Sequence, residues 1–545
     1  MSRTLRTVLF SIMCLSCLSV SIAGDYLRDL QNEAIEQDRS SVGHWGTDPA
    51  KYTQWGTHSS RLIPVYTFGT KGAGRGIGLA QYTHKMSAYR NEESIRKIYG
   101  IVPEQTLNPE ARYCDQTNLF DLQRAALEAG KKHIFLVVFD GMDWQTTRAA
   151  AIYGTGKVGY ERGRGTGLHF QDYTAGGTTQ FGFMVTSPAF ADGKIDVDQQ
   201  TVEPTGDPGG YAAALGGEFP WSEPADVPYL IGKSKQLVHP YPDSANTAGS
   251  MMSGIKTYNG SIGIDRTGGQ APAIAHLAQE RGYGVGVVSS VPISHATPAT
   301  AYAHNVSRDD YQDLSRDLLG LPSIAHPDAP LAGLDVVIGG GFGTVLEKDA
   351  GQGKNFKGGN RYLHEDDLKV SDIEHGGRYH VAIRTEGQAG SEQLKRAAET
   401  ASSKKGRLLG FYGVGKYSGH LPFQTADGDF QPAIGRKKTA EVYSEEDLRE
   451  NPTLAEMTSA ALQVLSIREQ GFWLMVEAGD VDWANHDNNL DNSIGAVFSG
   501  DEAVRRITDW VESHSSWNES ILIVTADHGH YLFLDKPELL VPPEQ

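Results

Sequence analysis

Five apolar runs rich in β-branched residues alternate with segments of helical character. The runs are HIFLVVFD (133–140), YGVGVVSS (283–290), LDVVIGGG (334–341), GFWLMVEAG (471–479) and SILIVTADHG (520–529). Continuous apolar runs of this length are typical of strands buried on both faces. QAPAIAHLAQERG (270–282) and TLAEMTSAALQVLSIREQG (453–471) have helical spacing. The alternation predicts an α/β fold, with a doubly wound, mostly parallel central sheet and helices on both faces.

Three of the predicted strands end in acidic residues: Asp140, Glu477 and Asp527. Ligands of open α/β sheets bind at the carboxyl ends of the strands. We therefore expect these carboxylates to share one site. Residues 190–235, rich in Gly, Pro and acids, predict an irregular excursion, and the charged run 436–450 predicts a solvated loop and a helix start.

Two segments carry carboxylates and imidazoles just beyond predicted strands. In VEAGDVDWANH (476–486), Asp482 and His486 are one helical turn apart, and VTADHGH (524–530) carries Asp527, His528 and His530. A single pair at this spacing also fits a hydrogen bond on a helix surface. Two such clusters favour a metal site, because carboxylate and imidazole suit zinc where cysteines are absent.

A further segment places Ser244 at a predicted loop-to-helix junction, in HPYPDSANTAGSMMSGIKTYNG (239–260). The free N–H groups and the dipole of a helix N-terminus favour a phosphate group. Taken alone, Asp243-Ser244 serves equally well as a helix cap. The acid and imidazole clusters elsewhere in the sequence favour the phosphate site over a simple helix cap.

Together these segments resemble the alkaline phosphatases. PDSANTAGSMMSGIKTYNGSIGID (242–265) is similar to the nucleophile segment of that family, and VEAGDVDWANH and VTADHGH match it too. The resemblance continues through SHATPATAYAHNVSRDDY (294–311) and LDVVIGGGFG (334–343) and covers most of residues 131–530 in the family's order. It implies hydrolysis of phosphate monoesters to an alcohol and inorganic phosphate, through a covalent phosphoserine on Ser244.

The resemblance also implies two Zn²⁺ and one Mg²⁺ per chain. The implied ligands are Asp140, Asp527 and His528 for the zinc beside Ser244, Asp482 and His486 for the second zinc, and Asp140, Glu477 and Thr297 for magnesium. The remaining implied residues are Arg308, which would bind two phosphate oxygens, His295 and Trp483, which would border the magnesium site, and His530, which would orient a ligand.

The family needs one more histidine on the second zinc, normally downstream of the VTADHGH-like motif, where this sequence has none. Instead, WGTHSSRLIPVYTFGTKGAG (55–74) and NEESIRKIYG (91–100) resemble the family's late segment and closing helix. We therefore predict a circular permutation within a single domain, residues 24–545. In it, residues 45–100 correspond to the family's C-terminal part and His58 completes the zinc site. The alternative is an unrelated loop histidine.

Composition and charge narrow the possible partners. Hydrophobic residues make up 39% and charged residues 21%, as in soluble globular proteins. The formal net charge of −18 argues against nucleic-acid binding, because the phosphate backbone would be repelled. We expect small phosphate monoesters as partners and leave a homodimer open.

Residues 1–23 read as a signal peptide, with Arg3 and Arg6 before an apolar run and Ala23 at the cleavage site. We expect export to the periplasm or the extracellular space, without a transmembrane anchor; a buried helix or a short anchor is the alternative. Cys14 and Cys17 lie in this segment, and lipidation of Cys17 stays open. Cys114 is then alone, so no internal disulfide can form.

Two other functions compete with a monoesterase. A phosphodiesterase or sulfatase of the same superfamily would use a similar metal pair, but Arg308, Thr297 and Glu477 favour the three-metal monoesterase. A catalytically dead metal-binding or phosphate-scavenging protein is the rival from another class, and Ser244 argues against it.

Overall fold

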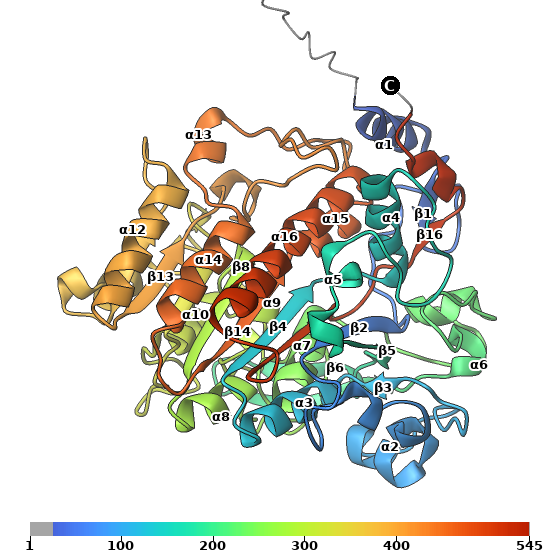
Figure 1. Cartoon of the computed structure of the whole chain (residues 1–545), viewed down its shortest axis with the longest axis horizontal. Helices are drawn as coiled ribbons and strands as arrows, with labels where there is room; N and C mark the ends of the chain where they lie inside the picture. The colour runs from blue at the N-terminus through green and yellow to red at the C-terminus, as the bar shows by residue number, and fades with distance from the viewer. Residues whose placement is uncertain (1–24, 544–545) are drawn as a thin grey trace, which may run out of the picture.

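A computed structural model describes residues 25–543 and contains a ten-stranded central sheet (Figure 1). In spatial order its strands are β12 (Tyr379–Ile383), β13 (Arg407–Phe411), β9 (Val336–Gly340), β8 (Gly284–Pro292), β14 (Phe472–Ala478), β4 (His133–Phe139), β15 (Ser520–Thr525), β2 (Ile63–Phe68), β5 (Gln180–Val185) and β3 (Cys114–Asp115). The five predicted apolar runs are the five neighbours from β9 to β15. All strands from β12 to β15 pair in parallel, which confirms the mostly parallel sheet.

The middle strands are covered on both faces. Successive side chains of a strand point to opposite faces, and every residue of β8, β14 and β15 is buried. The longer helices that surround the sheet are α1 (Tyr26–Gln37), α2 (Glu92–Tyr99), α3 (Thr117–Glu128), α4 (Trp144–Thr155), α7 (Ser244–Ser253), α10 (Tyr311–Leu319), α12 (Gly390–Ser403), α14 (Leu454–Leu465) and α16 (Leu490–His514). The shorter ones are α5 (His169–Asp172), α6 (Ala213–Gly216), α8 (Ile274–Glu280), α9 (Ala296–Thr300), α11 (Glu365–Ser371), α13 (Glu445–Arg449) and α15 (Asp480–His486).

Segments from the two ends of the described chain lie side by side. β2, which lies within the segment 55–74, pairs antiparallel with β15 and so joins the central sheet. β1 (Gly43–Trp45) pairs antiparallel with β16 (Leu532–Leu534), and the Tyr26 hydroxyl donates a hydrogen bond to the Leu540 carbonyl at 2.6 Å. Figure 1 shows α1 beside the C-terminal segment.

The prediction for residues 190–235 was wrong in part. β6 (Phe190–Asp196) and β7 (Thr201–Pro208) form an antiparallel hairpin, followed by α6 and a short 3₁₀ helix, Val227–Ile231. Most hairpin residues are exposed or half-buried. An exposed hairpin needs no alternating apolar stripe, so the sequence pattern does not reveal it.

Within residues 25–543, no helix has both the length and the apolar character needed to cross a membrane. The predicted signal peptide, residues 1–23, lies outside the described residues.

Candidate metal and phosphate site

Ser244 is the first residue of α7, as the sequence predicts for a loop-to-helix junction. Asp243 caps this helix by accepting a hydrogen bond from the backbone N–H of Asn246 at 3.0 Å. The Ser244 side chain is buried, and its Oγ lies 3.2 Å from Nε2 of His528. The cap therefore holds a hydroxyl at a helix N-terminus and beside an imidazole.

A first group of ligand-type side chains lies beside Ser244, where β4 and β15 end. Nε2 of His528 is 3.3 Å from Oδ1 of Asp140 and 3.6 Å from Oδ2 of Asp527. All three side chains are fully buried, and neither oxygen of Asp140 has a hydrogen-bond partner. Burial and the neighbouring charge of Asp527 raise the pKa of Asp140 well above its ordinary value. A cation among these atoms would offset both costs.

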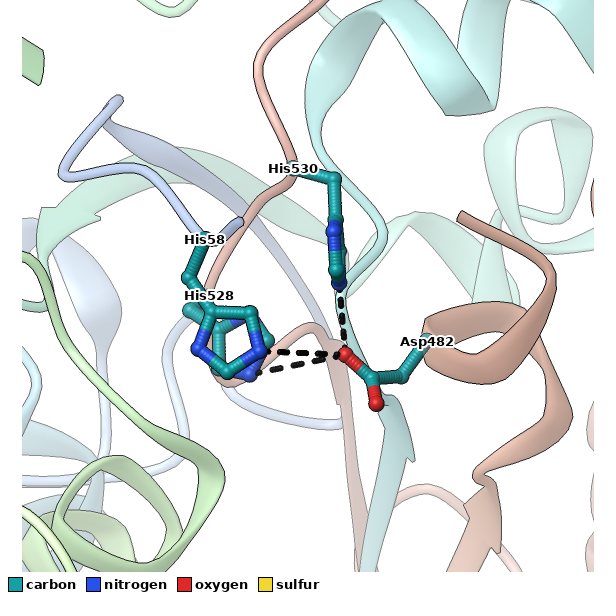
Figure 2. A group of neighbouring side chains, drawn as sticks. All are labelled: His58, Asp482, His528 and His530. Carbon is teal, nitrogen blue, oxygen red and sulfur yellow. Dashed lines mark hydrogen bonds and ion pairs between the residues drawn. The ribbon is translucent and has the colours of Figure 1, made fainter. Parts of the chain in front are cut away.

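A second group surrounds Asp482 (Figure 2). Nε2 of His58 lies 3.5 Å from Oδ1 of Asp482, as Figure 2 shows. Nε2 of His486 lies 2.9 Å from Nε2 of His58 and 3.6 Å from Oδ1 of Asp482. Asp482 and His486 lie one turn apart in α15, as predicted. His530 donates a hydrogen bond from Nε2 to Oδ1 of Asp482 at 2.6 Å.

The hydrogen bonds of His58 and His486 fix which ring nitrogen carries the proton. Nδ1 of His58 lies 2.8 Å from the carbonyl of Pro242, and Nδ1 of His486 lies 2.8 Å from the carbonyl of Gly56. A carbonyl only accepts, so in the neutral rings both protons sit on Nδ1. Two unprotonated Nε2 atoms then face each other, and a shared cation resolves their repulsion. This group thus fits a metal ion.

Glu477 and Thr297 lie outside the tightest acid–imidazole groups of the described chain. Oε1 of Glu477 and the Thr297 hydroxyl are buried without a hydrogen-bond partner, while the Ser289 hydroxyl donates to the other Glu477 oxygen. Burial raises the pKa of Glu477 to about 8. Unpartnered oxygen atoms suit a hard cation such as magnesium, so the donor set fits the ion that the resemblance implies.

Arg308 approaches the site from the loop after α9. Its Nη1 donates to Oδ2 of Asp243 at 3.0 Å, and its Nη2 lies 3.5 Å from Nε2 of His295. The rings of His295 and Trp483 are 5.7 Å apart between centroids. Asp243 therefore fixes both the helix that carries Ser244 and the guanidinium. This second role of Asp243 was missed, because only the cap is visible in the sequence.

A cavity of about 610 Å³ opens over these side chains. Its wall includes Ser244, Arg308 and His486, and further residues come from a segment without a recognisable motif: Lys416, Tyr417, Phe423, Lys437 and Glu441. The sequence predicts a solvated loop from residue 436 onward, so Lys437 and Glu441 were missed as cavity residues. The one local signal was the Gly-rich stretch FYGVGKYSGH (411–420), which permits tight turns.

A buried serine at a helix N-terminus, beside two carboxylate–imidazole groups at the carboxyl edge of the sheet, defines an α/β protein with a candidate phosphate-handling metal centre. The family model for alkaline phosphatase matches residues 229–537, which is more than half of the 545 residues. The chain belongs to the alkaline phosphatase family. Asp140 and His58 precede the range that the family model matches. Their place beside the other ligand-type side chains is therefore known from the structure alone.

Relatives and solved structures named alkaline phosphatase are similar to this chain at low sequence identity. Alkaline phosphatase 3 of Bacillus subtilis (strain 168) is 28% identical over 55% of this chain and 53% of its own length. Alkaline phosphatase of Escherichia coli (strain K12) is 29% identical over 61% and 68%. The cold-active alkaline phosphatase of Shewanella sp. covers 73% of this chain and 68% of that chain, at 20% identity and a TM-score of 0.43. The chain spans about half the length of the Bacillus subtilis relatives it matches.

Proposed function

We propose that this chain is an alkaline phosphatase that hydrolyses phosphate monoesters through a covalent phosphoserine on Ser244. The observation that carries the proposal is the 3.2 Å approach of the Ser244 hydroxyl to His528, at a helix N-terminus and among unpartnered carboxylate oxygens. Family membership and relatives named alkaline phosphatase support it.

In this proposal two Zn²⁺ and one Mg²⁺ occupy three sites. Their ligands are Asp140, Asp527 and His528 for one zinc, His58, Asp482 and His486 for the other, and Asp140, Glu477 and Thr297 for magnesium. When bound, such ions would supply Lewis-acid charge to stabilise the negative charge that develops on the reacting oxygens. Three dications and Arg308 would carry about plus seven, and the four carboxylates together with a Ser244 alkoxide would remove about five. The remaining charge of roughly plus two balances a phosphate dianion despite the acidic surface.

The chain's own residues bind and orient the substrate. The guanidinium of Arg308, held by Asp243, is placed to bind two phosphate oxygens in its planar fork. Oγ of Ser244 forms a bond to phosphorus as the bond to the departing alcohol oxygen breaks. Water then cleaves the phosphoserine and restores the hydroxyl. His530 holds the Asp482 carboxylate in one orientation.

We also propose that residues 45–100 take the place of the family's last segment, as in a circular permutant. Three features support this proposal: β2 enters the sheet beside β15, His58 lies beside His486, and Tyr26 contacts Leu540.

Acid trapping of a phosphoprotein tests the mechanism. With an aryl phosphate we expect labelled phosphoserine in wild type and in the matched control Ser253→Ala on the same helix, and none in Ser244→Ala. Rates on an aryl phosphate, a bis-aryl phosphate and an aryl sulfate test the substrate class. A faster diester or sulfate reaction would favour the phosphodiesterase or sulfatase alternative, and the absence of turnover with all three would favour a metal-binding protein without catalysis.

A further inference from the structure

A second cluster of ligand-type side chains lies outside the Ser244 cavity. It consists of His304, which follows α9, Asp317 in α10, and His326 in the loop beyond α10. Their exposed fractions are 5%, 1% and 9%, and one ligand atom from each lies within 4.8 Å of the others. None of the three lines the 610 Å³ cavity.

The hydrogen bonds around the cluster point the ligand atoms inward. Nε2 of His304 lies 3.3 Å from the Ala271 carbonyl, so the ring proton sits on Nε2 and the lone pair on Nδ1. That Nδ1 lies 2.9 Å from Nε2 of His326. Metal-binding histidines commonly donate their other ring N–H to a carbonyl in this way.

Hydrogen bonds also fix the orientation of the Asp317 carboxylate. Its Oδ1 accepts a hydrogen bond from the Ser323 hydroxyl at 2.5 Å, and its Oδ2 accepts the His304 backbone N–H at 3.0 Å. The same Oδ2 lies 3.9 Å from Nε2 of His326. A bound cation would offset the cost of burying the Asp317 carboxylate, which is 1% exposed.

We propose that His304 Nδ1, His326 Nε2 and the Asp317 carboxylate bind a divalent metal ion of the zinc type, separate from the ions of the Ser244 site. Metal–ligand bonds of about 2.0–2.1 Å in a tetrahedron set the ligand atoms about 3.3 Å apart. The observed separations of 2.9 and 3.9 Å lie on either side of that value. Water would complete the coordination, since His326 retains some exposure.

The position of this cluster gives the ion a structural role. His304 lies in sequence between Thr297 and Arg308, and Asp317 lies in the helix that follows Arg308. An ion that ties these segments together would brace the loop that delivers Arg308. The proposal does not depend on the reaction at Ser244, because it concerns metal content and stability.

Zinc content measured by mass spectrometry tests the site. We compare wild type with His326→Gln and with the exposed control His375→Gln, each loaded with zinc and dialysed. To separate the two kinds of site, the three forms are also made with Asp140→Asn and Asp482→Asn, which remove proposed ligands of the Ser244 site. We expect His326→Gln to hold one zinc per chain less than its parent in both backgrounds. Equal zinc in His326→Gln and its parent would overturn the proposal.

A second variant distinguishes the loss of a metal ligand from a loss of folding, because it should gain a spectroscopic signal. In cobalt-loaded His326→Cys, we expect a thiolate-to-cobalt charge-transfer band that His375→Cys lacks. Absence of the band in a folded, cobalt-loaded His326→Cys would mean that residue 326 does not bind metal and that His304, Asp317 and His326 form only a hydrogen-bonded cluster.

Discussion

Two groups of ligand-type side chains differ in how the fold positions them. The first lies within three residues of the ends of two neighbouring strands and consists of Asp140, Asp527 and His528. The second comes from a loop and a short helix and consists of His58, Asp482 and His486. The first group is fully buried, while the side chain of His486 is 37% exposed in the cavity wall. Adjacent parallel strands place their ends side by side, so the first group depends on sheet order alone. The second group requires residues far apart in sequence to meet across the cavity.

We expect the largest loss of activity from the strand-end group. In Asp527→Asn, the amide oxygen can still accept the N–H groups of Gly141 and His528, which Oδ1 now binds at 3.1 and 2.8 Å, so the fold should persist. Loss of the carboxylate charge should lower kcat on the order of 10³-fold, as expected for removal of several kcal/mol of charge stabilisation. Steady-state kinetics with zinc analysis measure this, with the exposed Asp509→Asn as control. Wild-type kcat in Asp527→Asn would rule out a role for this group.

We expect a smaller loss when the second group is opened. His58→Ala should release about one zinc per chain, because only Asp482 and the partly exposed His486 would remain to hold that ion. Since the ligands beside Ser244 stay intact, kcat should fall only about 10- to 100-fold. Zinc analysis and kinetics measure both effects, with the exposed His375→Ala as control. If His58→Ala keeps its full zinc content, His58 is an unrelated loop histidine and the permutation proposal fails.

Substitution of Arg308 tests whether phosphate binding by its guanidinium is independent of the two metal-ligand groups. Charge-assisted hydrogen bonds contribute about 1.5–3 kcal/mol, so Arg308→Ala should lower kcat/KM about 10- to 100-fold. Zinc content should remain that of wild type. Arg308→Lys should recover part of the loss, because it restores the charge without the planar fork. The exposed Arg505→Ala serves as control. An unchanged kcat/KM in Arg308→Ala would show that Arg308 does not bind the phosphate group of the substrate.

The smallest effect concerns stability at the opposite end of the strand that leads to Asp140. Burial lowers the pKa of His133, at the start of β4, to about 4. Between pH 4 and 6.5 the unfolded chain therefore binds more protons at this residue than the folded chain does, so its contribution to stability rises with pH across this window. His133→Gln should flatten that rise in the free energy of unfolding, measured in urea from pH 4 to 7. The same slope as in wild type would contradict this assignment.

The sequence predicts the centre of the fold well, because each middle strand is a continuous apolar run. Both predicted helices, within 270–282 and 453–471, are present as α8 and α14, and Asp482 and His486 share a face of α15. These features depend on neighbours within one segment. The structure also brings Asp140, Asp527 and His528 to one edge, which follows from the parallel order of β4 and β15.

The rest depends on contacts between distant segments. His58 and His486, whose Nε2 atoms face each other, are 428 positions apart in the sequence. No local sequence pattern predicts that contact. Lys416, in the short 3₁₀ helix Gly415–Tyr417, and Lys437, in a loop, both line the cavity. His304 and His326 are separated by a helix whose own spacing gives no sign of a ligand pair.

Anomalous scattering at the zinc edge, from a crystal of the zinc-loaded protein, tests most directly whether the separated segments converge on metal ions beside Ser244. We expect one peak among Asp140, Asp527 and His528 and a second among His58, Asp482 and His486. A zinc-loaded crystal with no peak at either group, or with His58 remote from the second peak, would contradict the assembly described here.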